Sequence, residues 1–215
     1  MAFFSPPARI PAILKWWYPS WYIWDKKEES KTLYLSFDDG PVPEVTPWVL
    51  ELLDRYNAKA SFFCIGDNIH KHPDVFKSLL AKGHRIGNHT LNHLKGWETP
   101  LEIYLENTQQ AQLLINASAK KETTKLFRPP YGKIKRNQAK RLRELGYDII
   151  MYRVIAYDWD AAISKEQCLH NVLHHTKDGD IVVFHDSIKA YEKLKYVLPK
   201  VLEHFSQKGY RFGLL

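Results

Sequence analysis

Cysteine is scarce in this chain of 215 residues, and long apolar runs are missing. Two cysteines, Cys64 and Cys168, are too few for a disulfide framework. Cys64 lies in an apolar run, which favours a buried reduced thiol, although a single disulfide between the two stays open. Internal repeats, low-complexity tracts and linkers are also absent, so the sequence predicts one domain with a substantial core.

A dense basic block is missing too, despite a formal net charge of +7 and an isoelectric point near 9.2. The densest groups of Lys and Arg lie at residues 133–136 and 140–143, and no nucleic-acid recognition motif accompanies them. The charge therefore favours a solvated basic surface and argues against nucleic acid as a partner. An anionic cell-wall polymer is another partner that such a charge suits.

The N-terminal residues 1–31 are rich in aromatic side chains but lack a membrane-targeting pattern. Four prolines and Lys15 interrupt the run, which also contains four tryptophans. It has neither the apolar centre of a signal peptide nor the roughly 20 apolar residues of a transmembrane helix. We interpret residues 1–31 as a strap packed on the domain, with peripheral membrane contact as the alternative. The compartment stays open between the cytoplasm and non-classical export.

From residue 32 to residue 215 the chain alternates short apolar strands with amphipathic helices. The expected strands lie at residues 33–37, 60–65, 84–87, 125–127, 148–154, 180–184 and 210–214. Helix starts are expected at Thr46, Pro73, Asn137 and Ser164, at a capping box over residues 99–102, and at Tyr191. This order predicts an α/β domain, and seven strand units favour a distorted (β/α)7 barrel over an open sheet. Its active site should lie at the carboxyl ends of the strands.

Polar clusters follow five of these strands. Asp38 and Asp39 follow the first, where one carboxylate can ligate a metal and the other accept a proton; an ordinary Asp–Asp–Gly–Pro turn is the alternative. His89 and His93 follow the third. If this stretch is helical, histidines four residues apart share one face and suit two imidazole ligands of one metal. Surface or capping histidines are the alternative for that pair.

The three later clusters are each ambiguous alone. Arg128 follows the fourth strand beside two prolines, where a fixed cation would hold Asp38 ionised. Asp158 and Trp159 follow the fifth and are typical of a sugar-contacting loop, or equally of an exposed acid beside a packed ring. His185 ends the sixth, where a core histidine is the alternative to a catalyst. All five clusters fall where the fold predicts an active site.

Taken together, the clusters resemble the signature of the NodB-type polysaccharide deacetylases, carbohydrate esterase family 4. The resemblance runs from about Thr32 to the C-terminus. It implies a distorted barrel with seven strands and a metal-dependent hydrolase acting on a linear, non-peptide amide bond. The implied reaction removes N-acetyl groups from the amino sugars of a chitin-like or peptidoglycan-like glycan.

The same resemblance implies roles for the acids and histidines. Asp38 matches the catalytic base, which takes a proton from the water that the metal activates. Asp39, His89 and His93 match the three metal ligands. His185 matches the general acid that protonates the departing amine.

Five further positions match supporting members of the signature. Arg128 is similar to the arginine that pairs with the base, and the backbone N–H of Tyr131 to the donor that stabilises the oxyanion. Asp158 and Trp159 resemble the acid and the aromatic that support the general acid. Val183 would line the pocket for the acetyl methyl group.

Three positions depart from the family pattern. Ser36 stands where threonine is usual, and Val183 stands where leucine is common, which would widen the methyl pocket. The family often places another acid before its Asp–Trp pair, but residues 152–155 contain none. The support around His185 is therefore expected to differ, whereas no implied metal ligand is affected.

The identity of the metal and of the acyl carrier stays open at this point. Zn2+ suits two imidazoles and a carboxylate, with Co2+ and Ni2+ as alternatives because affinity alone discriminates poorly. A hydrolase of small non-sugar amides is one alternative function, and a catalytically silent carbohydrate-binding relative is another. The oligomeric state is not predicted.

Overall fold

The structure is a computed structural model that describes residues 7–26 and 31–215. Its strands are β1 (Tyr22–Ile23), β2 (Thr32–Asp38), β3 (Ser61–Cys64), β4 (Arg85–Asn88), β5 (Leu126–Phe127), β6 (Asp148–Ile150), β7 (Val154–Ile155), β8 (Ile181–His185) and β9 (Arg211–Phe212). Its helices are α1 (Ala12–Lys15), α2 (Thr46–Arg55), α3 (Gly66–Lys71), α4 (Pro73–Ala81), α5 (Leu101–Ala119), α6 (Arg136–Glu144), α7 (Lys165–His175) and α8 (Ile188–Gln207), with 3-10 turns η1 (Gly96–Glu98) and η2 (Pro130–Gly132).

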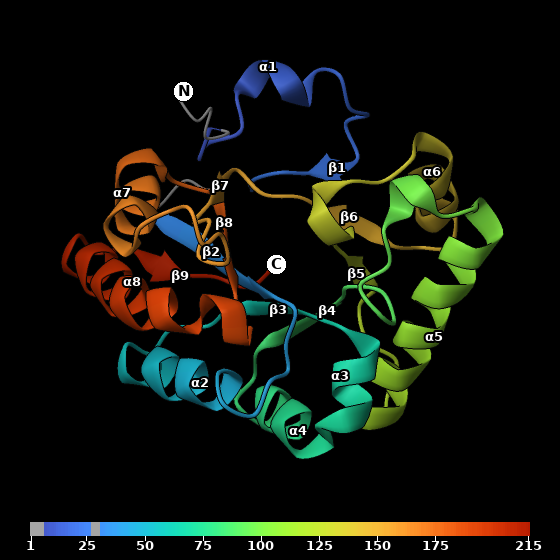
Figure 1. Ribbon diagram of the computed structural model, residues 1–215, viewed down its shortest axis with the longest axis horizontal. Coiled ribbons are helices and arrows are strands. Elements are labelled where there is room, and N and C mark those ends of the chain that lie inside the picture. The colour runs from blue at the N-terminus through green and yellow to red at the C-terminus, as the bar shows by residue number, and fades with distance from the viewer. Residues whose placement is uncertain (1–6, 27–30) are drawn as a thin grey trace.

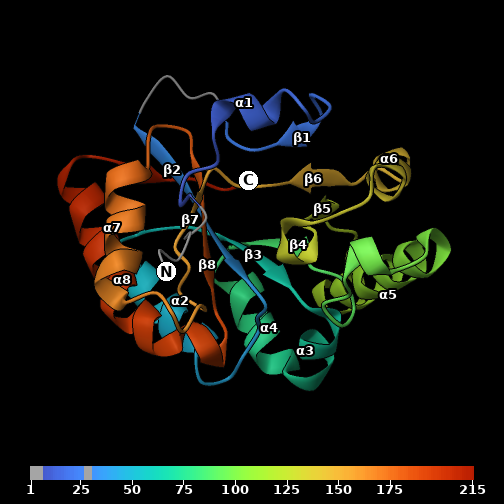
Figure 2. The ribbon, with the colours of Figure 1, turned by 45° about the horizontal axis from the view of Figure 1, so that its top comes forward.

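The strands form one curled parallel sheet whose outer surface is covered by helices (Figure 1). The strand order is β1-β6-β5-β4-β3-β2-β8-β7, and β9 pairs with the start of β2. Figure 2 shows α7 and α8 on one side of the sheet and α5 and α6 on the other. The expected barrel of parallel strands with peripheral helices is confirmed.

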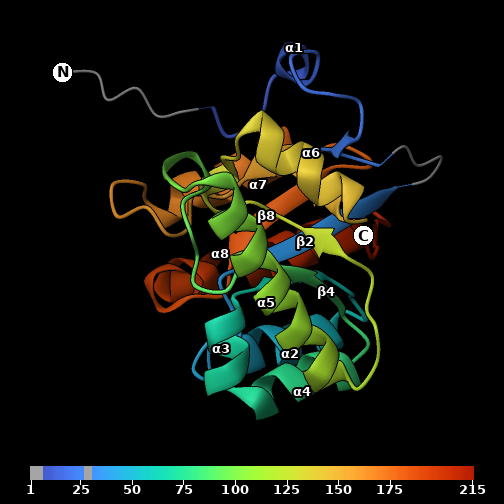
Figure 3. The ribbon, with the colours of Figure 1, turned by 90° about the vertical axis from the view of Figure 1, so that its right-hand side faces the viewer.

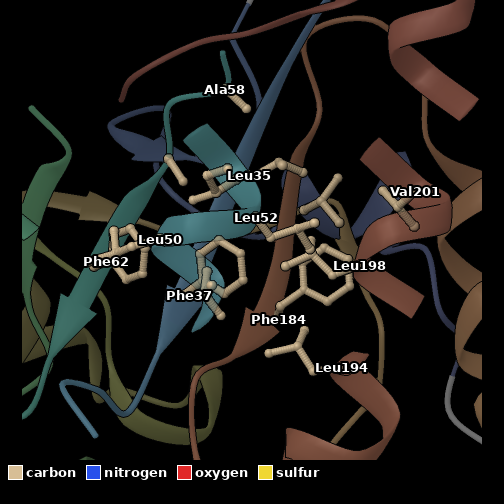
Figure 4. Close-up of a cluster of buried hydrophobic side chains, with 14 of the residues drawn as sticks. Leu35, Phe37, Leu50, Leu52, Ala58, Phe62, Phe184, Leu194, Leu198 and Val201 are labelled. Atoms are coloured by element: carbon tan, nitrogen blue, oxygen red, sulfur yellow. The ribbon is translucent and has the colours of Figure 1, made fainter. Parts of the chain in front are cut away.

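Strand β2 lies inside the sheet and is buried along its whole length. On its outer face, Phe37 stacks between Phe62 of β3 and Phe184 of β8, and this cluster packs against α2 and α8 (Figure 4). Because side chains alternate along a strand, Ser36 and Asp38 point to the opposite face, inside the barrel. The apolar pattern of β2 thus places one carboxylate in the interior at the carboxyl end of the sheet.

The N-terminal segment lies across the gap between the two edges of the sheet. Strands β6 and β7 are adjacent in sequence but stand at opposite sides of that gap. Strand β1 extends the edge at β6 in parallel, and Arg9 forms an antiparallel bridge with Val154 of β7. The backbone N–H of Ile155 donates to the carbonyl of Ala8 at 2.9 Å. In Figure 1 this segment arches over one side of the sheet.

Several expected elements differ from the observed ones. The single strand expected at 148–154 is two strands, because the Arg128 guanidinium donates hydrogen bonds to the carbonyls of Ile150 (3.4 Å) and Met151 (3.0 Å). Both carbonyls accept from Arg128 at the end of β6, and the chain then turns across the gap. The short β1 and α3 were not expected, and α8 begins three residues earlier than Tyr191.

One helix start follows its expected capping pattern and another does not. Ser164 caps α7, since its hydroxyl accepts the N–H of Gln167 at 3.1 Å. The capping box expected at 99–102 is wrong: Pro100 stands at the N-cap of α5, and the Thr99 hydroxyl donates to the Lys95 carbonyl at 2.7 Å. Thr99 therefore closes the preceding turn and leaves the helix end uncapped by a side chain.

Both cysteines are free and buried, as favoured for Cys64. Of the predicted extension over residues 1–31, residues 1–6 and 27–30 lie outside the described residues, and the boundary at residue 31 stays a prediction. Among the helices that the structure describes, none combines the length and apolarity required to cross a bilayer.

Candidate active site

Asp39, His89 and His93 form a candidate metal site at the carboxyl ends of β2 and β4. Their ligand atoms all lie within 4.8 Å of one another. Asp39 Oδ1 is 3.7 Å from His89 Nε2 and 3.3 Å from His93 Nε2. This oxygen is buried and accepts no hydrogen bond from any described residue. A buried carboxylate oxygen without a donor, facing two imidazole nitrogens, fits a divalent cation.

The orientation of the His89 ring and the pKa of His93 both suit binding of a cation. His89 Nδ1 lies 2.8 Å from the Arg128 carbonyl, which can only accept, so we assign the proton to Nδ1 and the lone pair to Nε2. Burial and the neighbouring His89 lower the pKa of His93 to about 4, against the opposing charge of Asp39. The His93 ring is therefore neutral near pH 7, as a ligand of a cation must be.

The two histidines are brought together by a loop, so the helical condition of the spacing argument is not met. Thr90 and His93 have φ values of 67° and 59°, and the stretch between β4 and η1 contains no helix. The Thr90 N–H donates to Asn88 Oδ1 at 2.9 Å, which holds the tight turn directly after the strand. Asp39 also has a positive φ of 84°. Left-handed conformations of non-glycine residues are costly, and here they gather at the candidate site.

Asp38 and Arg128 form a buried ion pair beside this site. Arg128 Nη1 donates to Asp38 Oδ1 at 2.8 Å and to Ser36 Oγ at 2.7 Å, and its guanidinium lies 4.0 Å from the ring centroid of Phe63. Burial raises the pKa of Asp38, but the charge and hydrogen bond of Arg128, together with nearby histidines, lower it below its ordinary value. Asp38 is therefore ionised near neutral pH.

His185 and Asp158 form a second pair, in which Asp158 is buried and His185 is partly exposed. Asp158 Oδ1 lies 2.8 Å from His185 Nδ1, and its Oδ2 accepts the backbone N–H of His185 at 2.8 Å. Burial alone would lower the pKa of His185, but the charge and hydrogen bond of Asp158, with smaller contributions from Asp39 and Asp38, raise it to about 9. The ring is thus protonated near pH 7. Because Asp38 pairs in register with His185 across β2 and β8, the base and acid candidates are neighbours.

Aromatic side chains surround these groups. The Trp159 ring lies 6.2 Å from that of His185 and the Tyr131 ring 4.6 Å from that of His93. Trp97 contacts Tyr131 edge to face at 5.2 Å, and both Tyr131 and Trp159 are largely exposed. Tyr131 has a φ of 60° within η2. Exposed rings beside a polar centre suit stacking on a sugar face.

Val183 is buried on β8, two residues before His185, so its side chain lies on the same face of the strand. The predicted site residues are therefore brought together: the ligand set, the two ion pairs and the flanking rings are linked by direct contacts. The oxyanion role of Tyr131 and the methyl pocket at Val183 stay predictions.

Two residues that hold Asp39 in place were not predicted from the sequence. Asp186 Oδ1 accepts the N–H of Gly40 at 3.0 Å, and its Oδ2 accepts the Thr46 hydroxyl at 2.5 Å. A Cβ on Gly40 would lie 2.0 Å from that carboxylate, so only glycine fits beside it. Asn68 Nδ2 donates to the Asp39 carbonyl at 2.7 Å. Burial raises the pKa of Asp186 to about 8.

The sequence carried a weak signal for one of them. Asp186 directly follows His185 at the end of a strand, so its proximity to the site could have been inferred. Asn68 lies in the short helix α3, which no apolar periodicity in the sequence predicted. Its contact with Asp39 depends on how the loops after β2 and β3 meet.

Known proteins share both this sequence pattern and this fold. The sequence profile of the polysaccharide deacetylases matches residues 25–150. The chain belongs to the polysaccharide deacetylase family. A Bacillus cereus peptidoglycan-N-acetylglucosamine deacetylase is 34% identical over 197 residues, which cover 90% of this chain and 91% of that protein. The solved structure of a peptidoglycan N-acetylglucosamine deacetylase matches with a TM-score of 0.85 and 31% identity, covering 90% of both chains.

Other family members are longer than this chain or act on another polymer. Peptidoglycan-N-acetylglucosamine deacetylase PgdA of Listeria monocytogenes is 33% identical, and the match covers 38% of its length. Chitin deacetylase 2 of Saccharomyces cerevisiae is 30% identical over 182 residues, covering 78% of this chain and 54% of that protein. The activity class that the resemblance implied, hydrolytic removal of N-acetyl groups from amino sugars, is confirmed at the level of this family. The family is metal-dependent, and Asp39, His89 and His93 are a candidate metal site in this deacetylase.

Proposed function

We propose that this deacetylase removes the acetyl group from N-acetylglucosamine residues of peptidoglycan. The observation that carries the proposal is the meeting of a three-ligand site with two ion pairs, the buried Asp38–Arg128 pair and the partly buried Asp158–His185 pair. Support for the polymer comes from the relatives in Bacillus cereus and Listeria monocytogenes, which are named for peptidoglycan. Chitin oligomers are the second candidate substrate, supported by the yeast relative.

Zn2+ is the metal we propose for Asp39, His89 and His93, because two imidazoles and one carboxylate suit it; Co2+ and Ni2+ are the alternatives. When bound, such a cation polarises the acetamide carbonyl and makes water more acidic. The three ligands come from the loops after β2 and β4, whose conformation includes positive φ values at Asp39, Thr90 and His93.

The residues of the chain would supply the proton transfers. Asp38, kept ionised by Arg128, accepts the proton of the attacking water as the base. His185, kept protonated by Asp158, donates a proton to the departing amine, which would otherwise leave as an unstable anion. The N–H of Tyr131 donates to the developing oxyanion, a contribution of roughly 3–4 kcal/mol for one such donor. Trp159 stacks on the sugar and Val183 bounds the acetyl methyl group.

A substrate panel read out as released acetate tests the proposal. The panel holds peptidoglycan fragments, chitin oligomers and small non-sugar amides, each with metal-loaded protein and with chelator. We expect the fastest acetate release from peptidoglycan fragments, its loss with chelator, and its return when Zn2+ is added back. Release from small amides alone would instead support the non-sugar hydrolase, and no release from any compound would support a silent binding relative.

The dependence of activity on pH should follow the Asp158–His185 pair. His185 must be protonated to act as the acid, so kcat/KM should fall as the pH rises through the pKa of His185. Asp158 raises that pKa, so Asp158→Asn should move the alkaline limb of the profile to lower pH. The matched control is Asp160→Asn, since the Asp160 carboxylate instead accepts the N–H of Ala162. Identical alkaline limbs in wild type and Asp158→Asn would contradict the assigned acid.

A further inference from the structure

The N-terminal segment lies at the edge of the molecule farthest from α2 and α4 (Figures 1 and 3). Exposed aromatic and aliphatic side chains cover its outside. We define the N-terminal patch as residues 13–18 together with Arg136 and Lys140 of α6. Trp16 is 86% exposed and Trp17 is 73% exposed. Ile13, Leu14 and Tyr18 in the same stretch are also exposed. Large contiguous apolar exposure of this kind marks an interaction surface.

The segment beneath the patch is fixed to the domain, so the exposed indoles are presented outward by a defined structure. Tyr18 packs edge to face on Tyr22 at 5.1 Å and on Trp24 at 5.2 Å, and both of these rings are buried. Lys15 forms an ion pair with Asp25 at 2.6 Å, which joins the end of α1 to the residues after β1. Trp16 and Trp17 therefore face solvent, although the buried rings of Tyr22 and Trp24 lie only a few residues away in the sequence.

Cations lie beside these rings. A hollow of about 530 Å³ separates the segment from α6, lined by Trp16, Trp17, Tyr18, Pro19, Trp21, Tyr22, Arg136 and Lys140. Arg136 also donates to the Trp17 carbonyl at 3.2 Å, which ties the patch to the start of α6. The described lining holds two cationic side chains and neither a carboxylate nor a carboxamide. The whole chain carries a net charge of +7.

We propose that the N-terminal patch docks this protein on the surface of an anionic lipid bilayer. Indole rings favour the headgroup level of a bilayer, aliphatic side chains such as Ile13 and Leu14 enter the acyl boundary, and Arg136 and Lys140 face lipid phosphates. A glycan platform fits less well, because Ile13 and Leu14 have no ring face for a sugar. The patch also lacks the carboxylates and amides that bind sugar hydroxyls.

One member of the patch, Arg136, lies close in sequence to a loop at the catalytic end of the barrel. Helix α6 begins at Arg136, four residues after Gly132 closes the turn that carries Tyr131. Docking through the patch would therefore hold the candidate active site close to the bilayer, where it can reach membrane-proximal substrate. The inference goes beyond the deacetylase reaction and does not depend on which glycan is used.

Vesicle co-sedimentation of the full chain tests this. The probes are vesicles of phosphatidylcholine alone and of phosphatidylcholine mixed with phosphatidylglycerol, at low and high salt. We expect the wild type to bind the anionic vesicles, and Trp16→Ala/Trp17→Ala to bind them about tenfold more weakly or worse. Arg136→Gln/Lys140→Gln should weaken binding to anionic vesicles only, and more at low salt. The control Ile103→Ala/Leu113→Ala, which removes two exposed apolar side chains from α5, should bind like the wild type.

Acetate release from a soluble oligosaccharide should be the same in the wild type and in Trp16→Ala/Trp17→Ala, which shows that the variant is folded. Wild-type protein that stays in the supernatant, or a Trp variant that binds as tightly as the wild type, would overturn the proposal. It would also be overturned if the tryptophan pair were needed instead for self-association in sedimentation velocity, or for retention on insoluble glycan, without vesicle binding.

Discussion

His89→Ala should lose both the bound metal and the deacetylase activity. His89 is a buried candidate ligand, and its Nε2 faces Asp39 Oδ1 while its Nδ1 is engaged by the Arg128 carbonyl. Without this imidazole, a carboxylate and one histidine remain, too few to hold a catalytic cation tightly. Since a metal supplies several kcal/mol of transition-state stabilisation, acetate release should fall by about 10³-fold or more.

Elemental analysis of the purified protein, combined with the acetate assay, measures both losses. His204→Ala is a suitable control, because it removes a histidine on α8 and should leave metal content and turnover unchanged. Because His89 is buried, His93→Ala provides a second variant whose side chain is partly exposed, with less risk to folding. Folding of each variant is checked by circular dichroism. Metal-free His89→Ala protein that still released acetate would rule out this site.

The sequence predicted the parts of the fold that follow from local patterns. Apolar runs such as residues 33–37 and 180–184 became the buried strands β2 and β8, because strands covered on both faces need apolar residues throughout. The two-residue β1 carries no such pattern and is a strand only through its pairing with β6. The break between β6 and β7 depends on the Arg128 side chain, which donates to the carbonyls of Ile150 and Met151 from the loop after β5.

The candidate site was predictable in its members but less so in its geometry. Strand-end placement brought Asp39 and the two histidines together, as parallel strands require. The spacing of the histidines was interpreted on the condition that the stretch is helical. Positive φ values at Thr90 and His93 make it a loop, and the residue types at these positions do not indicate positive φ. The support from Asp186 arises from a carboxylate meeting Gly40 across two strand ends, which sequence spacing does not encode.

Arg128→Met should cost both stability and activity, because it leaves Asp38 buried without its cation. Arg128 also supplies donors to Ser36 and to the carbonyls of Ile150 and Met151, so the chain turn beside the site loses its support. Removing one partner of a buried ion pair typically costs about 3–5 kcal/mol. The free energy of unfolding, measured by urea denaturation near neutral pH, should fall by about this amount. Arg85→Met, at a partly exposed arginine of β4, is the control and should cost much less.

The pH dependence of the stability loss in Arg128→Met distinguishes the loss of the ion pair from the loss of packing. In the wild type the pKa of Asp38 lies below its ordinary value, so the pair stabilises the fold at neutral pH, and this stabilisation is lost as the pH falls through that pKa. In Arg128→Met, burial raises the pKa of Asp38, so acid relieves the unfavourable charge. The stability difference between wild type and Arg128→Met should therefore narrow toward about pH 4. A difference independent of pH would assign the loss to packing alone.

Adding Asp38→Asn to Arg128→Met distinguishes the two roles of the pair. The neutral amide removes the buried charge, so the double variant should regain part of the stability that Arg128→Met loses. It should stay inactive, because an amide cannot accept the proton that the proposed base takes. In Arg128→Met alone, the raised pKa of Asp38 should also move the acid limb of the activity profile to higher pH. Recovery of stability in the double variant would show that Arg128 stabilises the fold by compensating the charge of Asp38.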